Sequence, residues 1–383
     1  MKILINGITI GEGSILPILI KSIYWQKHKY QITIFGPKTL HQEINNYQRF
    51  DNFQQLLLKW DKPVTSKFQF IFEALKRNLI SISYIPKIKD KYQVIHSISS
   101  MLDFIIFPYF LKLYNPRIVW VTVFDNIVPL TDPGNIIIRF LAWVFFNISL
   151  IFLKKVDTIF VISTDLKRFL IKHHFQKDKI VVTGNGVDVE LLKKAKKDPK
   201  IKIDSLYIGR INETKGIYHM LKALKQIVKT YPKFQFAIMG RGDTTSEGQF
   251  KNEVKKLNLT NNVQLLGYKR GLEKFSIIKS SKCFWFLSIS RSESFGIALM
   301  EAVCCNLPAI TYDLPIFKKI YKNNEITQCP KGDIDAVVKA TFDVLNNKQS
   351  RSDTNRKLLH KYSWDKIAQM ELKSINKHIE TKR

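Results

Sequence analysis

The chain has 383 residues and a formal net charge of +29, with 45% hydrophobic, 12% aromatic and 24% charged residues. This length exceeds what one hydrophobic core usually serves and predicts two domains, while the apolar content excludes an intrinsically disordered chain. The charge indicates either compositional drift or attraction to an anionic surface, of membrane lipid before polyanion. The sequence lacks a zinc finger, an RNP-like motif and a basic DNA-reading helix, so we expect no nucleic-acid partner.

The four cysteines, Cys283, Cys304, Cys305 and Cys329, show neither metal-ligand spacing nor a disulfide pattern. Such thiols favour a reducing compartment. The N-terminal sequence enters a strand and a glycine turn directly, without the apolar core of a signal peptide. We therefore expect a cytoplasmic protein.

In the first half, short apolar stretches alternate with longer amphipathic ones. The predicted strands are residues 2–8, 31–35, 92–96, 117–123 and 158–163. Near-continuous apolar strands separated by helical patterns indicate a parallel sheet covered on both faces. Gly11 and Gly13 follow the first strand as a turn, and His96 ends the third.

The apolar run of residues 135–153 is nearly long enough to span a bilayer. It contains Arg139 and Asn147 and is shorter than the ~20 apolar residues that a span needs. It also leads at once into the predicted strand 158–163. We expect a largely buried helix that helps the protein to dock on a membrane. Together with the aromatic stretch 104–112 and the basic composition, it predicts peripheral contact with an anionic membrane.

A further predicted strand, which begins at residue 179, ends in a Gly-Asn-Gly turn. This turn and a lysine-rich stretch at 193–202 place a domain boundary near residues 184–188. The alternation then restarts with predicted strands at 205–208, 234–239, 263–266, 283–287 and 309–312. We expect an α/β fold of two Rossmann-like domains, residues 1–185 and 186–360, with a final helix at 361–383. The cleft between two such domains is the default ligand site.

Two cations follow the first strand of the second domain. Gly209 opens a turn there, from which Arg210 and Lys215 emerge at the C-terminal edge of the sheet. Arg can grip two phosphate oxygens and Lys acts as a point charge, so the pair suits a diphosphate. The alternative is two surface residues that form salt bridges. Gly240, with Gly242, makes a similar turn after the next strand, which alone is weak evidence for a nucleotide.

Residues 291–310 carry two carboxylates, Glu293 and Glu301, separated by seven residues. A buried strand precedes them, Ser-Phe-Gly joins them, and a helical pattern follows. The backbone amides around Phe295 and Gly296 would be the free N–H groups of a helix N-terminus, which attract anions. Carboxylates do not bind phosphate, so they should face a neutral group rich in hydroxyls. A sugar phosphate ester has both parts.

This segment and the pattern from Gly209 to Gly216 resemble the signatures of retaining nucleotide-sugar glycosyltransferases of the GT-B fold, family 4 (group 1). The resemblance implies that Arg210 and Lys215 hold the diphosphate and stabilise the charge of the leaving group. Glu301 would bind the ribose hydroxyls, and Glu293 the donor sugar. The further implied donor-site residues are Phe295, Gly296, Gly209, Gly240 and Gly13.

The resemblance also implies how the reaction proceeds. A hexose would pass to a glycan or lipid-linked acceptor on one face of the sugar, and the leaving phosphate would take the proton of the acceptor. No metal and no cofactor beyond the donor are then expected. The last helix, which contains Trp364, would cross back to the first domain. We therefore expect a role in the synthesis of lipopolysaccharide or another cell-surface polysaccharide, at the cytoplasmic face of the membrane.

The first domain departs from the family pattern. Phe124 stands where a histidine is common, before Asp125, and Asn306 and Ile289 replace a usual glycine and proline. Asp125 and His96 are therefore candidates for the acceptor or sugar site, although the first domain matches the family pattern only in outline. Three alternatives stay open: a degenerate relative that binds nucleotide sugar without turnover, a sugar-nucleotide epimerase of the same fold, and a polyanion-binding module.

Overall fold

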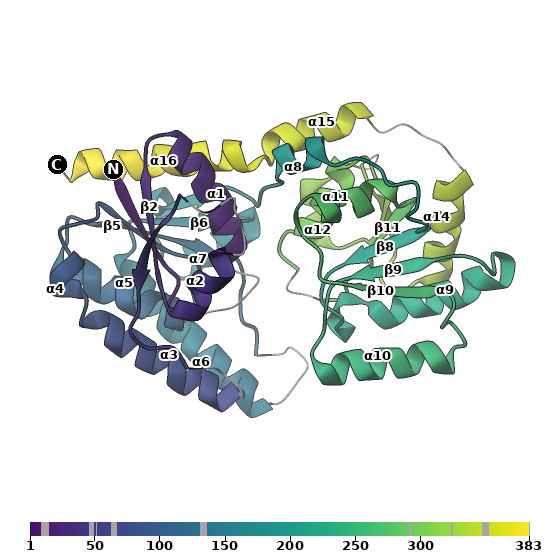
Figure 1. The fold of residues 1–383 in the computed structure, drawn as a ribbon, viewed down its shortest axis with the longest axis horizontal. Coiled ribbons are helices and arrows are strands. Elements are labelled where there is room, and N and C mark those ends of the chain that lie inside the picture. Colours follow the sequence, from purple (N-terminus) through teal and green to yellow (C-terminus); the bar gives the residue numbers. More distant parts are fainter. Residues whose placement is uncertain are drawn as a thin grey trace. The chain divides into compact units, whose positions relative to one another are not determined.

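The computed structural model describes residues 1–8, 15–45, 50, 52–62, 67–130, 136–290, 293–322, 325–346 and 352–382. The chain divides into two compact units. Unit 1 comprises Met1–Asn185 and Trp364–Arg383, and unit 2 comprises Gly186–Ser363 (Figure 1). Each unit is built around a parallel sheet, which confirms the predicted two-domain α/β, Rossmann-like fold.

The sheet of unit 1 has the strand order β3-β2-β1-β4-β5-β6-β7, and every ladder is parallel. The order reverses between β1 and β4, which is the kind of position where ligands meet open α/β sheets. The strands are β1 (Lys2–Asn6), β2 (Gln31–Gly36), β3 (Gln54–Leu57), β4 (Val94–Ser97), β5 (Val119–Phe124), β6 (Thr158–Val161) and β7 (Ile180–Val182).

Helices cover both faces of this sheet. They are α1 (Ile15–Lys27), α2 (Lys38–Asn45), α3 (Lys67–Ile82), α4 (Ile85–Ile88), α5 (Leu102–Tyr114), α6 (Ile136–Phe152), α7 (Thr164–Lys172) and α16 (Trp364–Thr381). One connection runs from β1 through α1 to β2, and another runs from β4 through α5 to β5. These two connections step across the sheet in opposite directions. Since both are right-handed, α1 and α5 lie on opposite faces. Accordingly, α1 and α16 lie above the sheet in Figure 1, and α3 and α6 lie below it.

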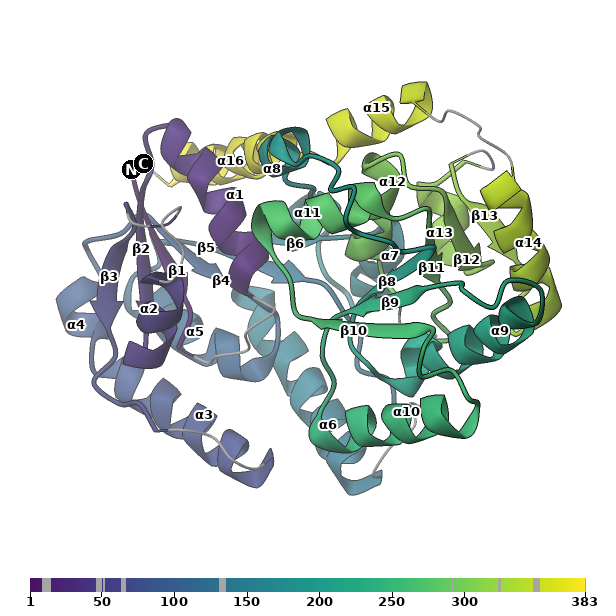
Figure 2. The ribbon, with the colours of Figure 1, turned by 45° about the vertical axis from the view of Figure 1, so that its right-hand side comes forward.

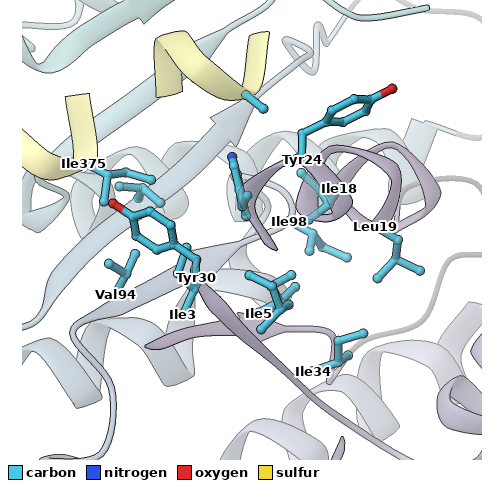
Figure 3. Packing of buried hydrophobic residues seen from close by; sticks show 14 of the residues in the cluster. Ile3, Ile5, Ile18, Leu19, Tyr24, Tyr30, Ile34, Val94, Ile98 and Ile375 are labelled. Atoms are coloured by element: carbon cyan, nitrogen blue, oxygen red, sulfur yellow. The ribbon is translucent and has the colours of Figure 1, made fainter. Parts of the chain in front are cut away.

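The C-terminal helix α16 is part of the core of unit 1. Ile375 of α16 packs with Ile3 of β1, Val94 of β4 and Ile18 of α1 in one buried cluster (Figure 3). Lys21 of α1 also donates to Glu371 of α16 at 2.7 Å, and both side chains are buried. Burial lowers the pKa of Lys21 and raises that of Glu371, while the attraction between the two charges opposes both shifts. Since an unpaired buried charge is costly, the ion pair fixes α16 to α1.

Unit 2 repeats this architecture with six parallel strands in the order β10-β9-β8-β11-β12-β13. The strands are β8 (Ser205–Ile208), β9 (Phe236–Met239), β10 (Val263–Gly267), β11 (Cys283–Phe286), β12 (Ala309–Tyr312) and β13 (Thr327–Cys329). The helices are α8 (Val189–Lys194), α9 (Ile217–Thr230), α10 (Thr244–Lys256), α11 (Gly271–Ser280), α12 (Ile297–Cys304), α13 (Pro315–Ile320), α14 (Ile334–Asn346) and α15 (Ser352–Lys361). Here the order reverses between β8 and β11, so the ends of these two strands are the natural ligand position.

The prediction of a largely buried helix at 135–153 is wrong. Within the described part of the chain, one helical segment, Ile136–Lys155, is long and apolar enough to cross a membrane by length and composition. Only 22% of its most apolar window is buried. Phe146, Ser149 and Leu150 of α6 face the core, whereas Ile136 and Ile151 are exposed. The α6 sequence is apolar on all sides, so the sequence alone could not show which side of the helix packs against the core. By contrast, most apolar residues of the aromatic stretch 104–112, in α5, are buried.

Candidate functional site

The turn after β8 holds the two predicted cations. Asn212 accepts hydrogen bonds from the backbone N–H (2.9 Å) and the hydroxyl (2.7 Å) of Thr214, which closes a short 3₁₀ turn at Glu213–Lys215. The Tyr207 hydroxyl donates to the carbonyl of Arg210 at 3.0 Å. The Arg210 side chain is exposed and forms no ion pair with any residue that the structure describes. A guanidinium in this state is available to an anion.

Gly216 lets this turn pack against the end of β11. Its φ is +75°, and a Cβ at this position would lie 1.8 Å from the carbonyl oxygen of Leu287. Only glycine combines this conformation with so close an approach. The carbonyl of Thr214 also accepts from the N–H groups of Ile289 (3.0 Å) and Ser290 (3.1 Å). The turn after β8 is thus attached to the segment that leads to Glu293.

Lys215 and Glu293 form an ion pair. The Lys215 Nζ lies 2.7 Å from the Glu293 Oε2, and the side chains are 22% and 10% exposed. The contact brings together two motifs that lie 78 residues apart in the sequence. Burial raises the pKa of the neighbouring Tyr207, and the negative charge of Glu293 raises it further. The tyrosine therefore stays neutral and acts as a hydrogen-bond donor.

Glu301 lies in α12, one turn beyond its start. Gly296 precedes the helix in the left-handed conformation (φ +75°), and the buried ring of Phe295 packs against Tyr362 at 5.3 Å between centroids. These two residues set the direction of the first turn, whose N–H groups have no partner within the helix. The Glu301 Oε1 accepts from Lys274 of α11 at 2.6 Å.

Sequence reasoning missed Lys274. In the sequence it is one of 61 Lys and Arg residues, and no motif around it marks it. With Lys274 included, the site has two carboxylates, each paired with one lysine.

Two glycines close the neighbouring edge of the site. A Cβ on Gly240 would lie 1.9 Å from the carbonyl oxygen of Gly209. Gly209 donates to Met239 at 3.1 Å, and Gly240 donates to Gly267 at 2.9 Å. The ends of β8, β9 and β10 are thus held close together, directly before the turn that carries Arg210.

The unit 1 candidates do not form a comparable cluster in the described residues. His96 of β4 is fully buried, with its ring 5.4 Å from Trp25 and 6.5 Å from Phe160 between centroids. Burial, followed by the charge of Lys21, holds the pKa of His96 well below its ordinary value. A neutral histidine without an exposed atom is suited to packing.

Asp125 directly follows β5 and is exposed. The preceding Phe124 is buried, with its ring 6.0 Å from that of Phe146 and 5.9 Å from that of Phe169. The residue that replaces the usual histidine is therefore a core residue against α6 and α7. Gly13 lies outside the described residues, as do Gly11 and Arg291.

The chain contains one Asp-x-Asp sequence, Asp333 to Asp335, a pattern that often binds metal. Asp333 accepts from the N–H of Ala336 at the start of α14 (2.9 Å), and Asp335 accepts from Gln226 (2.9 Å). Both carboxylates make structural contacts. Over the residues with assigned positions, no group of three or more His, Cys, Asp or Glu side chains is placed to hold a metal ion.

A cavity of about 370 Å³ lies between β13 and α14. Its charged lining consists of Lys339 and Asp343, whose side chains lie 3.6 Å apart and offset each other. Neither Glu293 nor Glu301 lines it. The chemistry of unit 2 is concentrated at the ends of β8 and β11 instead.

Comparison with known proteins gives a consistent result. The family described as Glycosyl transferases group 1 matches residues 188–358, and that described as Glycosyltransferase Family 4 matches residues 22–191. An uncharacterised glycosyltransferase of Methanocaldococcus jannaschii is 31% identical over 170 residues, 42% of this chain and 40% of that protein. A phosphatidyl-myo-inositol mannosyltransferase of Mycobacterium leprae is 28% identical over 192 residues, 48% of this chain and 50% of that protein.

Solved structures share the fold over nearly the whole chain. HepE of Anabaena, in complex with UDP and glucose, has a TM-score of 0.75 at 12% identity, covering 98% of this chain and 99% of that chain. Identity this low speaks for the fold alone. The chain spans half or less of the length of the two sequence relatives, so the activity of the whole protein is a matter of proposal.

Proposed function

Because this chain belongs to the group 1 glycosyltransferases, glycosyltransferase family 4 with the GT-B fold, we propose that it transfers a hexose from a nucleoside diphosphate sugar to a hydroxyl group. The acceptor is a glycan or a lipid-linked glycan, and the anomeric configuration is retained. The Lys215–Glu293 contact carries this proposal, since it joins a cation suited to a diphosphate to a carboxylate suited to a sugar.

Each side chain of the site has a role in this scheme. Arg210 and Lys215 bind the diphosphate, with the first turn of α12 contributing N–H groups to the same charge. Glu293 accepts hydrogen bonds from the donor sugar, and Glu301 from the ribose hydroxyls. Lys274 holds the Glu301 carboxylate in place through its 2.6 Å contact.

In the transfer step, the bond between the anomeric carbon and the terminal phosphate oxygen breaks. The acceptor oxygen forms its bond on the same face of the sugar, and its proton passes to the leaving phosphate. The negative charge on that phosphate grows towards the transition state, so fixed cations at Arg210 and Lys215 lower the barrier. We propose that these cations serve in place of a metal and that no cofactor is used.

The acceptor class is supported by the relatives. One acts, by its name, on a phosphatidyl-inositol lipid, and a Bacillus subtilis relative is named as a poly(glycerol-phosphate) alpha-glucosyltransferase. The four cysteines are free thiols, which fits the reducing cytoplasm that we propose as the location. We place the reaction at the cytoplasmic face of the membrane, in the synthesis of a cell-surface glycan.

Calorimetric titration with UDP, GDP, ADP and dTDP in the absence of metal tests the donor site. We expect one nucleotide to bind, and its hexose conjugates then define the donors to offer with lipid-linked acceptors. The anomeric configuration of the product, read by NMR, tests retention. No binding of any nucleotide at millimolar concentration would remove the proposal, and binding without turnover over all acceptors would identify a degenerate relative.

A further inference from the structure

The helices below the sheet of unit 1 present apolar side chains outward. Phe72, Leu75 and Leu79 recur at helical spacing on α3, and Ile136, Phe140, Trp143 and Ile151 recur on α6. We call these seven residues the apolar face; their side chains are 37% to 70% exposed. Both helices lie on the same side of the sheet in Figures 1 and 2, and both contact α5, whose Leu113 is exposed as well. A soluble monomer rarely leaves so many large apolar side chains together in water.

The two helices that carry this face expose no acidic side chain. Glu73 is the one acidic residue of α3, and it is buried and accepts from the Trp60 indole at 2.6 Å. The sequence of α6 contains no acidic residue. At the edge of the face, the ammonium groups of Lys76 and Lys62 lie 3.5 Å and 5.0 Å from the centroid of the Trp60 ring. An indole beside lysines suits the boundary between the hydrocarbon and the headgroups of a bilayer.

From this combination we propose that the apolar face docks unit 1 on an anionic lipid bilayer. Its apolar side chains enter the outer hydrocarbon region, and Lys62, Lys76 and the Trp60 indole lie at the level of the anionic headgroups. The inference extends the proposed function by naming the surface that meets the membrane in which a lipid-linked acceptor lies. The biological purpose of docking rests on the proposed function, whereas the docking itself does not.

Two other occupants are less compatible with the structure. A second copy would bring two identical basic edges together in a protein of net charge +29, which like-charge repulsion opposes. A membrane span would have to extract α6 from unit 1. However, its continuation at Leu153 and Val156 is buried, and Asp157 is bound by Lys112 and Lys382 at 2.7 Å each. The helix therefore lies along the membrane surface, and the Asn147 amide in its exposed stripe donates to the carbonyl of Trp143 at 2.8 Å.

Vesicle co-flotation tests this surface. The full chain is mixed with vesicles of phosphatidylcholine containing about 30% phosphatidylglycerol, at low and at high salt, and with vesicles of phosphatidylcholine alone. We expect binding to the anionic vesicles that weakens with salt, because the lysine contribution is screened. The double variant Leu79→Glu with Phe140→Glu should lower the partition coefficient at least about tenfold, since it places two carboxylates in the contact.

Tyr231→Glu is the matched control, because Tyr231 is half exposed in unit 2, at the end of α9. It should change the partition coefficient by less than about twofold. Circular dichroism, thermal unfolding and nucleotide binding must match the wild type in both variants, so that loss of folding cannot imitate loss of docking.

The inference is overturned by a wild type that ignores anionic vesicles at low salt, or by a double variant that floats as well as the wild type. A wild-type dimer that the double variant converts to a monomer in sedimentation would assign the face to a second copy instead. Nucleotide binding without vesicle binding removes this inference and leaves the proposed function intact. Vesicle binding without nucleotide binding removes the proposed function and leaves this inference intact.

Discussion

Lys215→Ala separates specific diphosphate recognition from the general basicity of the chain. The lysine lies at the C-terminal edge of the sheet, and its charge is held 2.7 Å from Glu293 in a site where both side chains are mostly buried. A charge-assisted contact to phosphate in such a place contributes about 1.5–3 kcal/mol. We therefore expect the Kd of the cognate nucleoside diphosphate to rise about 10- to 150-fold, and kcat to fall on the order of a hundredfold or more.

Calorimetry without metal measures the first effect and initial rates the second. Lys229→Ala is the control, since it removes the same charge from an exposed position in the last turn of α9. It should leave the Kd within about twofold of the wild-type value, because an exposed charge at the far end of α9 from the site is screened. If Lys215→Ala binds as the wild type does, or if Lys229→Ala weakens binding equally, the diphosphate is held by the net charge of the surface and the reasoning is refuted.

Three further changes probe the same structure. Gly216→Ala should lower the free energy of unfolding by about 2–5 kcal/mol in urea, through a strained φ and a clash with a backbone carbonyl, whereas Gly248→Ala in α10, which has open space, should raise it by about 0.5–1 kcal/mol. Equal effects would contradict the close approach at Gly216. The pKa of His96 is held well below 6.5 in the fold, so below about pH 6.5 the unfolded chain binds the extra proton and stability falls by up to ~1.4 kcal/mol per pH unit. Thermal unfolding of His96→Phe should therefore depend less steeply on pH than that of the wild type, and identical slopes would contradict a buried neutral histidine. Glu293→Gln should bind free nucleoside diphosphate at least as tightly as the wild type, because it releases Lys215, while kcat falls on the order of a hundredfold; weaker binding in calorimetry would argue against competition for Lys215.

Much of the fold could be predicted because its central strands are continuous apolar runs. The strands predicted at 205–208 and 309–312 coincide with β8 and β12, and the other predicted strands are placed with ends that differ by a residue or two. The exceptions are β3 and β13, which the sequence did not indicate. Both are edge strands of three or four residues with polar side chains. Such strands lack a hydrophobic pattern of their own, and only their pairing with a neighbouring strand identifies them.

The candidate site was predictable where local sequence determines it. Gly296 precedes α12 and Gly216 precedes α9 as turn residues that only glycine fills without strain, so the motifs marked both helix starts. Lys274 was not predictable, because its contact with Glu301 depends on how α11 packs beside α12. The exposure of α6 was not predictable for the same reason, since it depends on which neighbours cover an apolar helix.

If the site binds a nucleoside diphosphate sugar as we propose, the two ion pairs determine how that donor enters. Each carboxylate neutralises one lysine, so Arg210 is the excess cation of the five charged side chains assigned to the site. A diphosphate brings more negative charge than one arginine balances, so we propose that its binding draws Lys215 away from Glu293. The freed Glu293 then has lone pairs for the hydroxyl groups of the donor sugar. A free nucleoside diphosphate has only its ribose hydroxyls, which we assign to Glu301. The hydroxyl groups of the sugar thus donate hydrogen bonds to the Glu293 carboxylate, which has lost Lys215 to the diphosphate. Lys274 stays on Glu301 throughout, because the ribose can share that carboxylate with it. Such an exchange makes the intact donor a better ligand for this site than its two halves taken separately.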